Sequence, residues 1–349
     1  DAYEDPTIKR SRSHEYVSKE VANVRENVGV IELANFSKHE FKGKESRKYL
    51  DYVLAGRIPK PGRISLCPML TMKGKLCGDL TVACLSEVEF IVFGSGAAQE
   101  AHRRWFENHL GSLDVKYSNR SDDFHGLAIA GPRSRDLLQK IVREDVSNDA
   151  FKFRDTKKLF VAGVPAVVNR ISFTGELGYE IYVAPHFQLK LFEEIESAGK
   201  EFNVKPFGSR ALMSMRLEKN WGAWTLDYRP DFTAKESGLD VFINWEKDFI
   251  GKESAMNDDS NLKLTSLIVK TSDIDVTNNE SVMKENKSIG YITSGGYAHH
   301  VGESIAFSYL DKEDINSGKN IQVEINGDMY DSIIINEPLY DPSGKKMRS

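Results

Sequence analysis

The stretch SFTGELGYEIYV, from Ser172 to Val183, combines the period of a β-strand with residues that weaken strands. Its second half alternates apolar and polar side chains, yet the stretch holds two glycines and two glutamates, which strands disfavour. In an extended chain the apolar residues fall on one face: Leu177, Tyr179, Ile181 and Val183. The opposite face carries the unusual set: Glu176, Gly178, Glu180 and Tyr182.

A glycine between two carboxylates leaves a flat notch in the strand, where a planar ligand or another backbone segment can come close. Fully extended, the two carboxylates would lie about 13 Å apart, at ~3.3 Å per residue. Paired glycosidase acids need only roughly 5–9.5 Å, so that chemistry is excluded. We therefore expect one carboxylate to meet a ligand and the other to be structural. The alternative is a tight turn over TGELG followed by an edge strand whose glutamates face water.

The composition is that of an ordinary globular protein of two or three domains. The 349 residues are 40% hydrophobic and 28% charged, with a net charge of −5 spread along the chain. Without a basic stripe we expect no nucleic-acid partner, and no apolar run approaches the ~18 residues of a membrane span. Three cysteines without a C-x-x-C spacing favour a reducing compartment, the cytoplasm or, in a eukaryote, the mitochondrial matrix. No metal site is expected, because His299-His300 has no carboxylate or cysteine at ligand spacing.

The chain divides at the polar run NDDSN, residues 257–261. Before it, helix and strand patterns mix, and Lys73-Gly74 separates two alternating runs as in a hairpin. A helical stripe near the N-terminus is formed by four valines: Val17, Val21, Val24 and Val28. After the polar run, short strands and turns dominate, with Asn326-Gly327 as a hairpin turn. We predict an α+β body over residues 1–256 and a β-domain over 262–349.

Seven motifs then follow in a fixed order: MLTMKGKLCGDLTV, GLAIAGP, RISFTGELGYEIYV, FGSRALMSMRLEK, FTAKESGLDVFI, DFIGKESA and GYITSGGY. Together they resemble the aminomethyltransferase family of the glycine cleavage T-protein. The motif sequences are most similar to those of the folate-binding C-terminal half of dimethylglycine and sarcosine dehydrogenases. The resemblance covers nearly the whole chain, from about Glu15 to Pro338.

The resemblance implies a folate-binding α+β body closed by a jelly-roll-like β-barrel, with tetrahydrofolate as the cofactor. It implies an enzyme that takes the methylene unit of an oxidised N-methyl amine to give 5,10-methylene-tetrahydrofolate. In the resembled dehydrogenases an FAD domain makes the iminium. No G-x-G-x-x-G fingerprint opens this chain, so FAD is expected only on a separate domain or partner subunit. The chain opens without a methionine and suggests a separated subunit or a piece of a longer protein.

Three residues match family positions around the reacting carbon and the ring. Glu180 matches the pterin-binding glutamate, since a carboxylate can accept from a ring N–H and the exocyclic amine beside it. Gly178 would give the ring its flat approach. Asp79 matches the catalytic aspartate near folate N5, where a carboxylate can stabilise a cationic nitrogen or accept its proton.

Three further positions are assigned to folate binding by the same resemblance. Arg210 matches the family's folate-binding arginine, whereas Arg216 is expected in a structural ion pair with Glu218 or a strand end. Met69, which opens the first motif, is also expected at the folate. Phe173 stands where the family has a tyrosine, so one polar contact is missing or supplied elsewhere.

Two alternatives stay open. The first keeps the chemistry but changes the donor to the lipoyl-bound aminomethyl group of a glycine cleavage T-protein, or to another methyl donor. The replacement of the T-protein's aspartate pair by Gly78-Asp79 argues against it. The second is a non-catalytic folate-binding module. Family members of that kind carry a cysteine in the glycine-rich motif, and residues 174–180 contain none.

Overall fold

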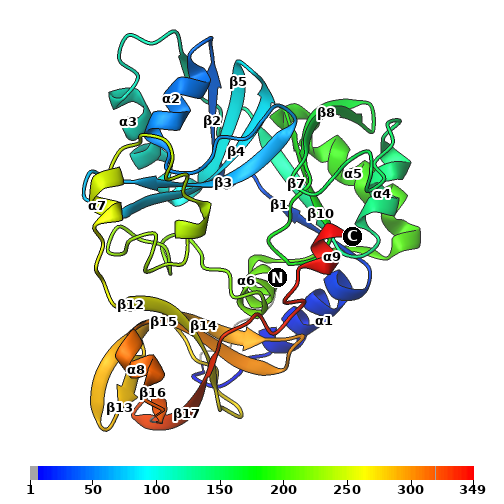
Figure 1. Ribbon diagram of the computed structural model, residues 1–349. Helices are drawn as coiled ribbons and strands as arrows, with labels where there is room; N and C mark the ends of the chain where they lie inside the picture. The colour runs from blue at the N-terminus through cyan, green and yellow to red at the C-terminus, as the bar shows by residue number, and fades with distance from the viewer. Residues whose placement is uncertain (1–6, 319) are drawn as a thin grey trace.

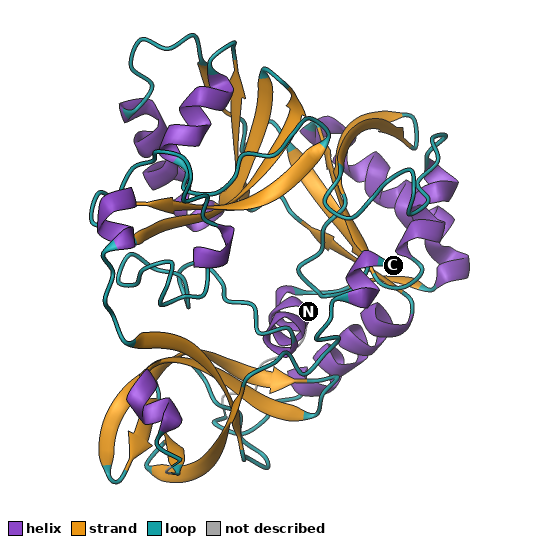
Figure 2. Cartoon of the chain, viewed as in Figure 1, coloured by secondary structure: helices purple, strands orange, loops and turns teal. Residues whose placement is uncertain are grey.

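The computed structural model describes residues 7–318 and 320–349. Figures 1 and 2 show two sheets with helices on their outer sides and a separate β-barrel below them. The first sheet, sheet A, has six strands in the order β11, β1, β7, β10, β9 and β8, all antiparallel except the β1–β11 pair. Its strands are β1 (Val28–Glu32), β7 (His125–Ala130), β8 (Thr156–Val161), β9 (Val164–Asn169), β10 (Gly178–Val183) and β11 (Val204–Pro206).

The second sheet, sheet B, has five antiparallel strands in the order β3, β4, β5, β2 and β6. Its strands are β2 (Phe36–Lys42), β3 (Arg63–Leu70), β4 (Leu76–Ser86), β5 (Glu89–Ser95) and β6 (Lys116–Asn119). The expected hairpin at Lys73-Gly74 is the β3–β4 connection, where Gly74 adopts φ +73°. A side chain at Gly74 would also clash with the backbone of Ala255. Both the positive φ and this close contact therefore require a glycine in the turn.

Helices cover the outer face of each sheet. The helices of the body are α1 (Ser13–Glu26), α2 (Ser46–Val53), α3 (Gln99–Asn108), α4 (Ser134–Ile141), α5 (Gln188–Gly199), α6 (Ser209–Glu218) and α7 (Lys252–Met256). On sheet A, Tyr179, Ile181 and Val183 pack in one core with leucines of α4 and α5. On sheet B, Leu80 and Val82 pack with side chains of α2 and α3. The opposite faces of the two sheets are therefore left to face each other.

The valine stripe predicted the first helix, but its last member, Val28, lies two residues beyond the end of the helix at Glu26. Val17, Val21 and Val24 are buried on α1 against Ala211 and Met215 of α6. Val28 instead begins β1 and packs in the core of sheet A. Val21 and Val28 are seven residues apart, which is two helical turns, so the valine that begins the next strand still fits the helical spacing. The pattern therefore could not mark the end of the helix.

The C-terminal domain is a closed barrel in the strand order β12, β15, β14, β13, β16 and β17. Its elements are β12 (Leu262–Val269), β13 (Ser281–Lys284), β14 (Lys287–Ala298), β15 (Glu303–Asp311), α8 (Lys312–Asn316), β16 (Ile321–Ile325) and β17 (Asp328–Ile335). The strand pairs of the barrel are antiparallel. Asn326 and Gly327 both have positive φ, which confirms the hairpin turn. The prediction of an α+β body followed by a β-barrel is confirmed.

The last segment of the chain leaves the barrel and returns to the body. Figure 1 shows it running from β17 to α9 (Lys345–Arg348), beside the part of sheet A that carries α4 and α5. Tyr340 lies on the way, with its ring 3.7 Å from the guanidinium carbon of Arg25. The barrel is thus joined to the body at both of its ends.

Candidate functional site

The inner faces of the two sheets meet in a small apolar cluster. Its buried members come from both sheets and from the segments beside them: Leu33, Ile64, Ala83, Ile91, Phe93, Val167 and Tyr182. The rings of Phe93 on β5 and Tyr182 on β10 stack with centroids 4.5 Å apart. This contact places β5 and β10 opposite each other. We call the two inner faces together the inter-sheet site.

Glu180 faces the inter-sheet site from β10. It lies on the same side of the strand as Tyr182, whose hydroxyl donates to Glu180 Oε2 at 3.0 Å. The carboxylate is partly buried, and this burial raises its pKa to about 7, although the hydrogen bond from Tyr182 and the nearby Asn169 amide lower it. The expected division of this strand into two faces is confirmed. Near neutral pH the carboxyl group can therefore exist in both charge states.

Asp79 faces the same space from β4. Its neighbours Leu80 and Val82 point into the core under α2 and α3, and the alternation of the strand turns Asp79 and Ala83 to the inner face. Burial raises the pKa of Asp79 to about 7. Burial also raises the pKa of Tyr228, and the nearby Asp79 carboxylate adds to that shift. The predicted catalytic aspartate and the predicted pterin-binding glutamate thus stand on facing sheets, each with a pKa near 7.

Glu176 has a different environment. It precedes β10 and is only 1% exposed, and its Oε1 accepts from Arg25 at 3.0 Å and also from the Tyr340 hydroxyl. Arg25 pairs in addition with Glu218, which is fully buried. The expectation that one glutamate of the opening stretch is structural is confirmed, and Glu176 is that residue.

The notch expected beside Gly178 is filled by the chain itself. A side chain there would come within 2.6 Å of the Cβ of Ser172, so the glycine lets the preceding turn fold back on the strand. Phe173, in that turn, is 37% exposed and stacks on Trp221 with centroids 5.8 Å apart. The turn before the strand that carries Glu180 thus holds the Phe173 ring, which Trp221 from the loop after α6 covers on one side.

Met69 lies on the wrong side of its sheet for a ligand contact. It pairs with Gly78 across β3 and β4 and is 1% exposed, packed in the core beneath α2 and α3. Asp79 points the other way from the same strand pair. Its place in the register turns its side chain to the outer face, where it has a packing role, and a folate contact at Met69 stays a prediction.

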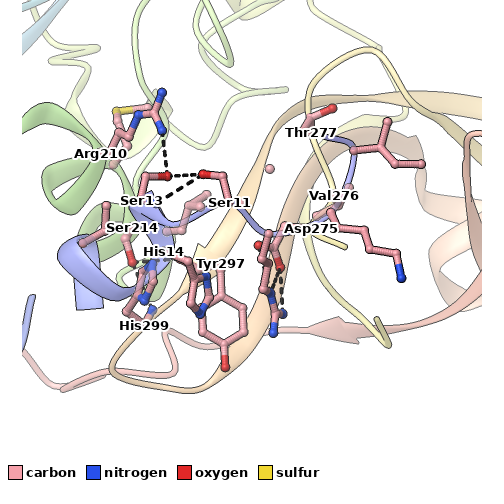
Figure 3. Close-up of a pocket in the computed structure, with 18 of the residues that line it drawn as sticks. Ser11, Ser13, His14, Arg210, Ser214, Asp275, Val276, Thr277, Tyr297 and His299 are labelled. Carbon is pink, nitrogen blue, oxygen red and sulfur yellow. Dashed lines mark hydrogen bonds and ion pairs between the residues drawn. The ribbon is translucent and has the colours of Figure 1, made fainter. Parts of the chain in front are cut away.

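Arg210 is also placed elsewhere. It lines a pocket of about 650 Å³ formed by the segment around Ser13, the helix α6 and the barrel residues near Tyr297. Figure 3 shows its guanidinium group donating to Ser13 Oγ, a bond of 3.1 Å. Neither Asp79 nor Glu180 lines this pocket. Arg210 therefore lies in another pocket than the two carboxylates, and its role in folate binding stays a prediction.

Arg216 has the structural role expected of it, with another partner. It is 1% exposed and pairs with Asp227 at 2.8 Å rather than with Glu218. Asp227 in turn accepts from the hydroxyls of Thr293 and Ser294 on the barrel strand β14. The ion pair joins α6, the loop after it and the barrel.

Two residues of the inter-sheet site escaped the sequence analysis. Lys38 on β2 is fully buried, donates to the carbonyl oxygens of Leu33 and Ala34, and pairs in register with Phe93. Burial lowers the pKa of Lys38 to about 8, against the fields of carboxylates that include Glu180. Asn169 on β9 is fully buried directly opposite Glu180. Asn169 could have drawn attention as a polar residue at the end of an apolar run, whereas Lys38 stands among polar neighbours and gave no signal.

Within the described residues, the structure contains no cluster of three or more metal-ligating side chains. In that same part of the chain, no helix is both long and apolar enough to cross a membrane.

Comparisons with known proteins agree with the motifs. The family model of the GCVT N-terminal domain matches residues 1–247, and that of the glycine cleavage T-protein C-terminal barrel domain matches residues 263–341. Mitochondrial dimethylglycine dehydrogenase of Mus musculus is 38% identical over 342 residues, which cover 96% of this chain and 39% of that protein. This chain therefore spans about two fifths of the length of that relative.

Two further matches cover almost the full length of the protein that is compared with this chain. An aminomethyltransferase of Desulfitobacterium hafniense (strain Y51) is 30% identical over 335 residues, 94% of this chain and 91% of that protein. The crystal structure of the glycine cleavage system aminomethyltransferase T from Bartonella henselae superimposes with a TM-score of 0.84 at 19% identity. That match covers 93% of this chain and 90% of the other, and it shows that the fold is shared.

Proposed function

The chain belongs to the aminomethyltransferase family, and we propose that it binds a reduced folate in the inter-sheet site and transfers a one-carbon unit to it. The observation that carries this proposal is the pair of carboxylates, Asp79 and Glu180, on facing sheets with pKa values raised to about 7. Buried carboxyl groups held near neutrality, without an ion-pair partner of their own, are typical of sites that bind or transfer protons.

The residues present fit a pterin ring. Such a ring offers two adjacent donors, a ring N–H and an exocyclic amine, and an ionised carboxylate is the side chain that accepts from both. Glu180 can do so because Tyr182 occupies only its Oε2. The stacked pair Phe173 and Trp221 offers apolar ring surface close by. Glu180 would hold the ring and orient it, and Tyr182 would keep the carboxylate in place.

When bound, tetrahydrofolate supplies the nitrogens that accept the carbon unit. Asp79 would lie near the nitrogen that becomes cationic as the new bond forms. Its carboxylate can stabilise that charge and take up the proton, and a pKa of about 7 makes the proton easy both to gain and to lose at neutral pH. Lys38, which lies in the same space, adds a buried positive field that favours the ionised form of Glu180.

The carbon donor is proposed to be an oxidised N-methyl amine of the dimethylglycine or sarcosine type. Support comes from the 38% identity to dimethylglycine dehydrogenase, of which this chain covers only 39%. The oxidation would then take place on an FAD domain or subunit outside this chain. The 30% identity to an aminomethyltransferase over nearly its whole length supports the alternative, an aminomethyl donor of the glycine cleavage type.

Two experiments test the proposal. Calorimetric titration with 5-formyltetrahydrofolate should show one site, and Glu180→Ala should weaken it by about 1–3 kcal/mol because buried ring donors lose their partner. Glu193→Gln, an exposed glutamate on α5, is the matched control and should bind as the wild type. Incubation with tetrahydrofolate and either dimethylglycine plus its dehydrogenase or an aminomethyl-lipoyl donor then distinguishes the two carbon sources. Absence of folate binding would refute the proposal, and binding without transfer from either donor would leave a folate-binding module.

A further inference from the structure

Three polar residues stand side by side across sheet A where its neighbours are apolar. Thr156 on β8 pairs with Asn169 on β9, and Asn169 pairs with Glu180 on β10. Adjacent strands lie about 4.8 Å apart, so the three side chains form a continuous row on the inner face. Thr156 is 3% exposed and Asn169 is fully buried.

The row fixes the orientation of the Asn169 amide. Thr156 Oγ1 donates to Asn169 Oδ1 at 2.7 Å. On the other side stands the Glu180 carboxylate, which can only accept when ionised, so the amide must turn its NH₂ group toward Glu180. Asn169 Nδ2 comes close enough to Glu180 to lower the pKa of that carboxyl group. Its geometry nevertheless falls short of a hydrogen bond, and Nδ2 is a buried donor without a partner among the described residues.

A buried amide donor of this kind is uncommon, because folded proteins satisfy most of their buried polar groups. This donor is held in one orientation and stands directly beside the carboxylate proposed to hold the ring. The site therefore presents an acceptor and, one strand away, a donor that makes no hydrogen bond among the described residues.

We propose that Asn169 is a ligand-contacting residue that donates to the 4-oxo group of the pterin ring and so selects 2-amino-4-oxo rings. The inference rests on the proposed function and extends it. Along one edge such a ring carries the 2-amino group, the N3–H and the 4-oxo group, in the order donor, donor, acceptor. Glu180 would receive the two donors, and Asn169 Nδ2 would meet the acceptor next to them. Thr156 is a positioning residue that keeps the amide from turning over.

The test compares wild type with Asn169→Leu, which keeps the approximate size of the side chain and removes the donor. Affinity for 5-formyltetrahydrofolate is measured by calorimetry at pH 6.5 and pH 9. Loss of one hydrogen bond to the ligand should weaken binding roughly tenfold at both pH values. If Asn169 acts only by favouring the ionised form of Glu180, the loss will vanish at pH 9, where that group is ionised in both proteins. The other titratable groups near it, Lys38 and Tyr182, are common to both.

A second ligand and a second variant keep the inference falsifiable. Methotrexate carries an amine in place of the 4-oxo group, so Asn169→Leu should leave its affinity unchanged or raise it. Equal losses for both ligands would overturn the inference. Thr156→Val removes the lock on the amide and should weaken 5-formyltetrahydrofolate binding less than Asn169→Leu does, with methotrexate again unaffected. If Asn169→Leu does not fold, Thr156→Val still tests the inference by itself. Binding of neither ligand by the wild type would refute the proposed function itself, a result distinct from loss of the 4-oxo preference.

Discussion

Replacing Glu180 by glutamine should stabilise the protein while it weakens folate binding. The ordinary pKa of a glutamate, 4.5, is raised to about 7 at Glu180, so the folded state binds the proton more tightly than the unfolded state does. At 1.36 kcal/mol per pH unit, the ionised carboxylate costs the fold about 3 kcal/mol. The cost is absent below pH 4.5, grows as the pH rises toward 7, and is complete above it. Glutamine, which is neutral at every pH, avoids it.

The expected result is a stability difference that depends on pH. Above pH 8, Glu180→Gln should exceed the wild type by up to about 3 kcal/mol, which corresponds to several degrees in melting temperature for a chain of this size. At pH 5 the difference should be close to zero. Thermal unfolding is followed by circular dichroism at both pH values. Glu193→Gln on the surface of α5 is the control, and it should match the wild type at both.

Two titrating neighbours, Lys38 and Tyr182, interact with the Glu180 charge, so their own pKa values fall in Glu180→Gln. Both stay fully in their low-pH form at pH 5, so the comparison at pH 5 is free of their titration, and Asp79 is common to both proteins. A variant less stable than the wild type by the same amount at pH 5 and pH 8.5 would refute the reasoning. It would mean that the carboxylate is held by its hydrogen bonds and is not strained by burial.

Three further predictions concern separate parts of the molecule. Asp79→Asn should change folate affinity by less than about tenfold but lower the transfer rate by roughly 10²–10⁴, as for a lost acid–base group; equal transfer above the background of free formaldehyde would make Asp79 structural. Arg210→Ala should leave the affinity for 5-formyltetrahydrofolate within about twofold of wild type by calorimetry, since neither Asp79 nor Glu180 lines the pocket of Arg210, and a larger loss would show that Arg210 binds the folate. Arg25→Met should lower the free energy of unfolding by about 3–5 kcal/mol in urea because Glu176 and Glu218 stay buried without their cation, whereas Arg103→Met on the exposed face of α3 should cost less than about 1 kcal/mol; similar values for the two would contradict the importance of burial.

The sequence was most informative where a pattern is local. The alternation in the opening stretch correctly assigned Tyr179 and Glu180 to opposite faces, and Asn326-Gly327 located its turn, because strand period and turn chemistry depend on adjacent residues. The division into an α+β body and a β-barrel also followed from a local feature, the change from mixed helix and strand patterns to short strands and turns. The family motifs pointed to Asp79 and Glu180, which the fold then placed on facing sheets.

What the sequence could not show depends on contacts across the chain. The space beside Gly178 is taken by Ser172, and Met69 turns away from the site because of its register with Gly78. Arg210 opens a helix in the expected motif, yet its surroundings are set by how α1 and the barrel pack around α6. Asn169 became a candidate site residue only because the structure places it opposite Glu180 on the neighbouring strand. None of these arrangements leaves a periodic signal.

The return of the chain from the barrel to Arg25 has a consequence for synthesis. Arg25, Glu176 and Glu218 can meet once α6 has formed, but the ring of Tyr340, which covers Arg25 at 3.7 Å, emerges more than a hundred residues later. At roughly 5–20 residues per second, this buried ion network stands uncovered for on the order of ten seconds on the ribosome. During that interval water can reach the charges and the body can still open. Tyr340, made more than a hundred residues after Glu218, thus completes the charge network that Arg25 on α1 begins.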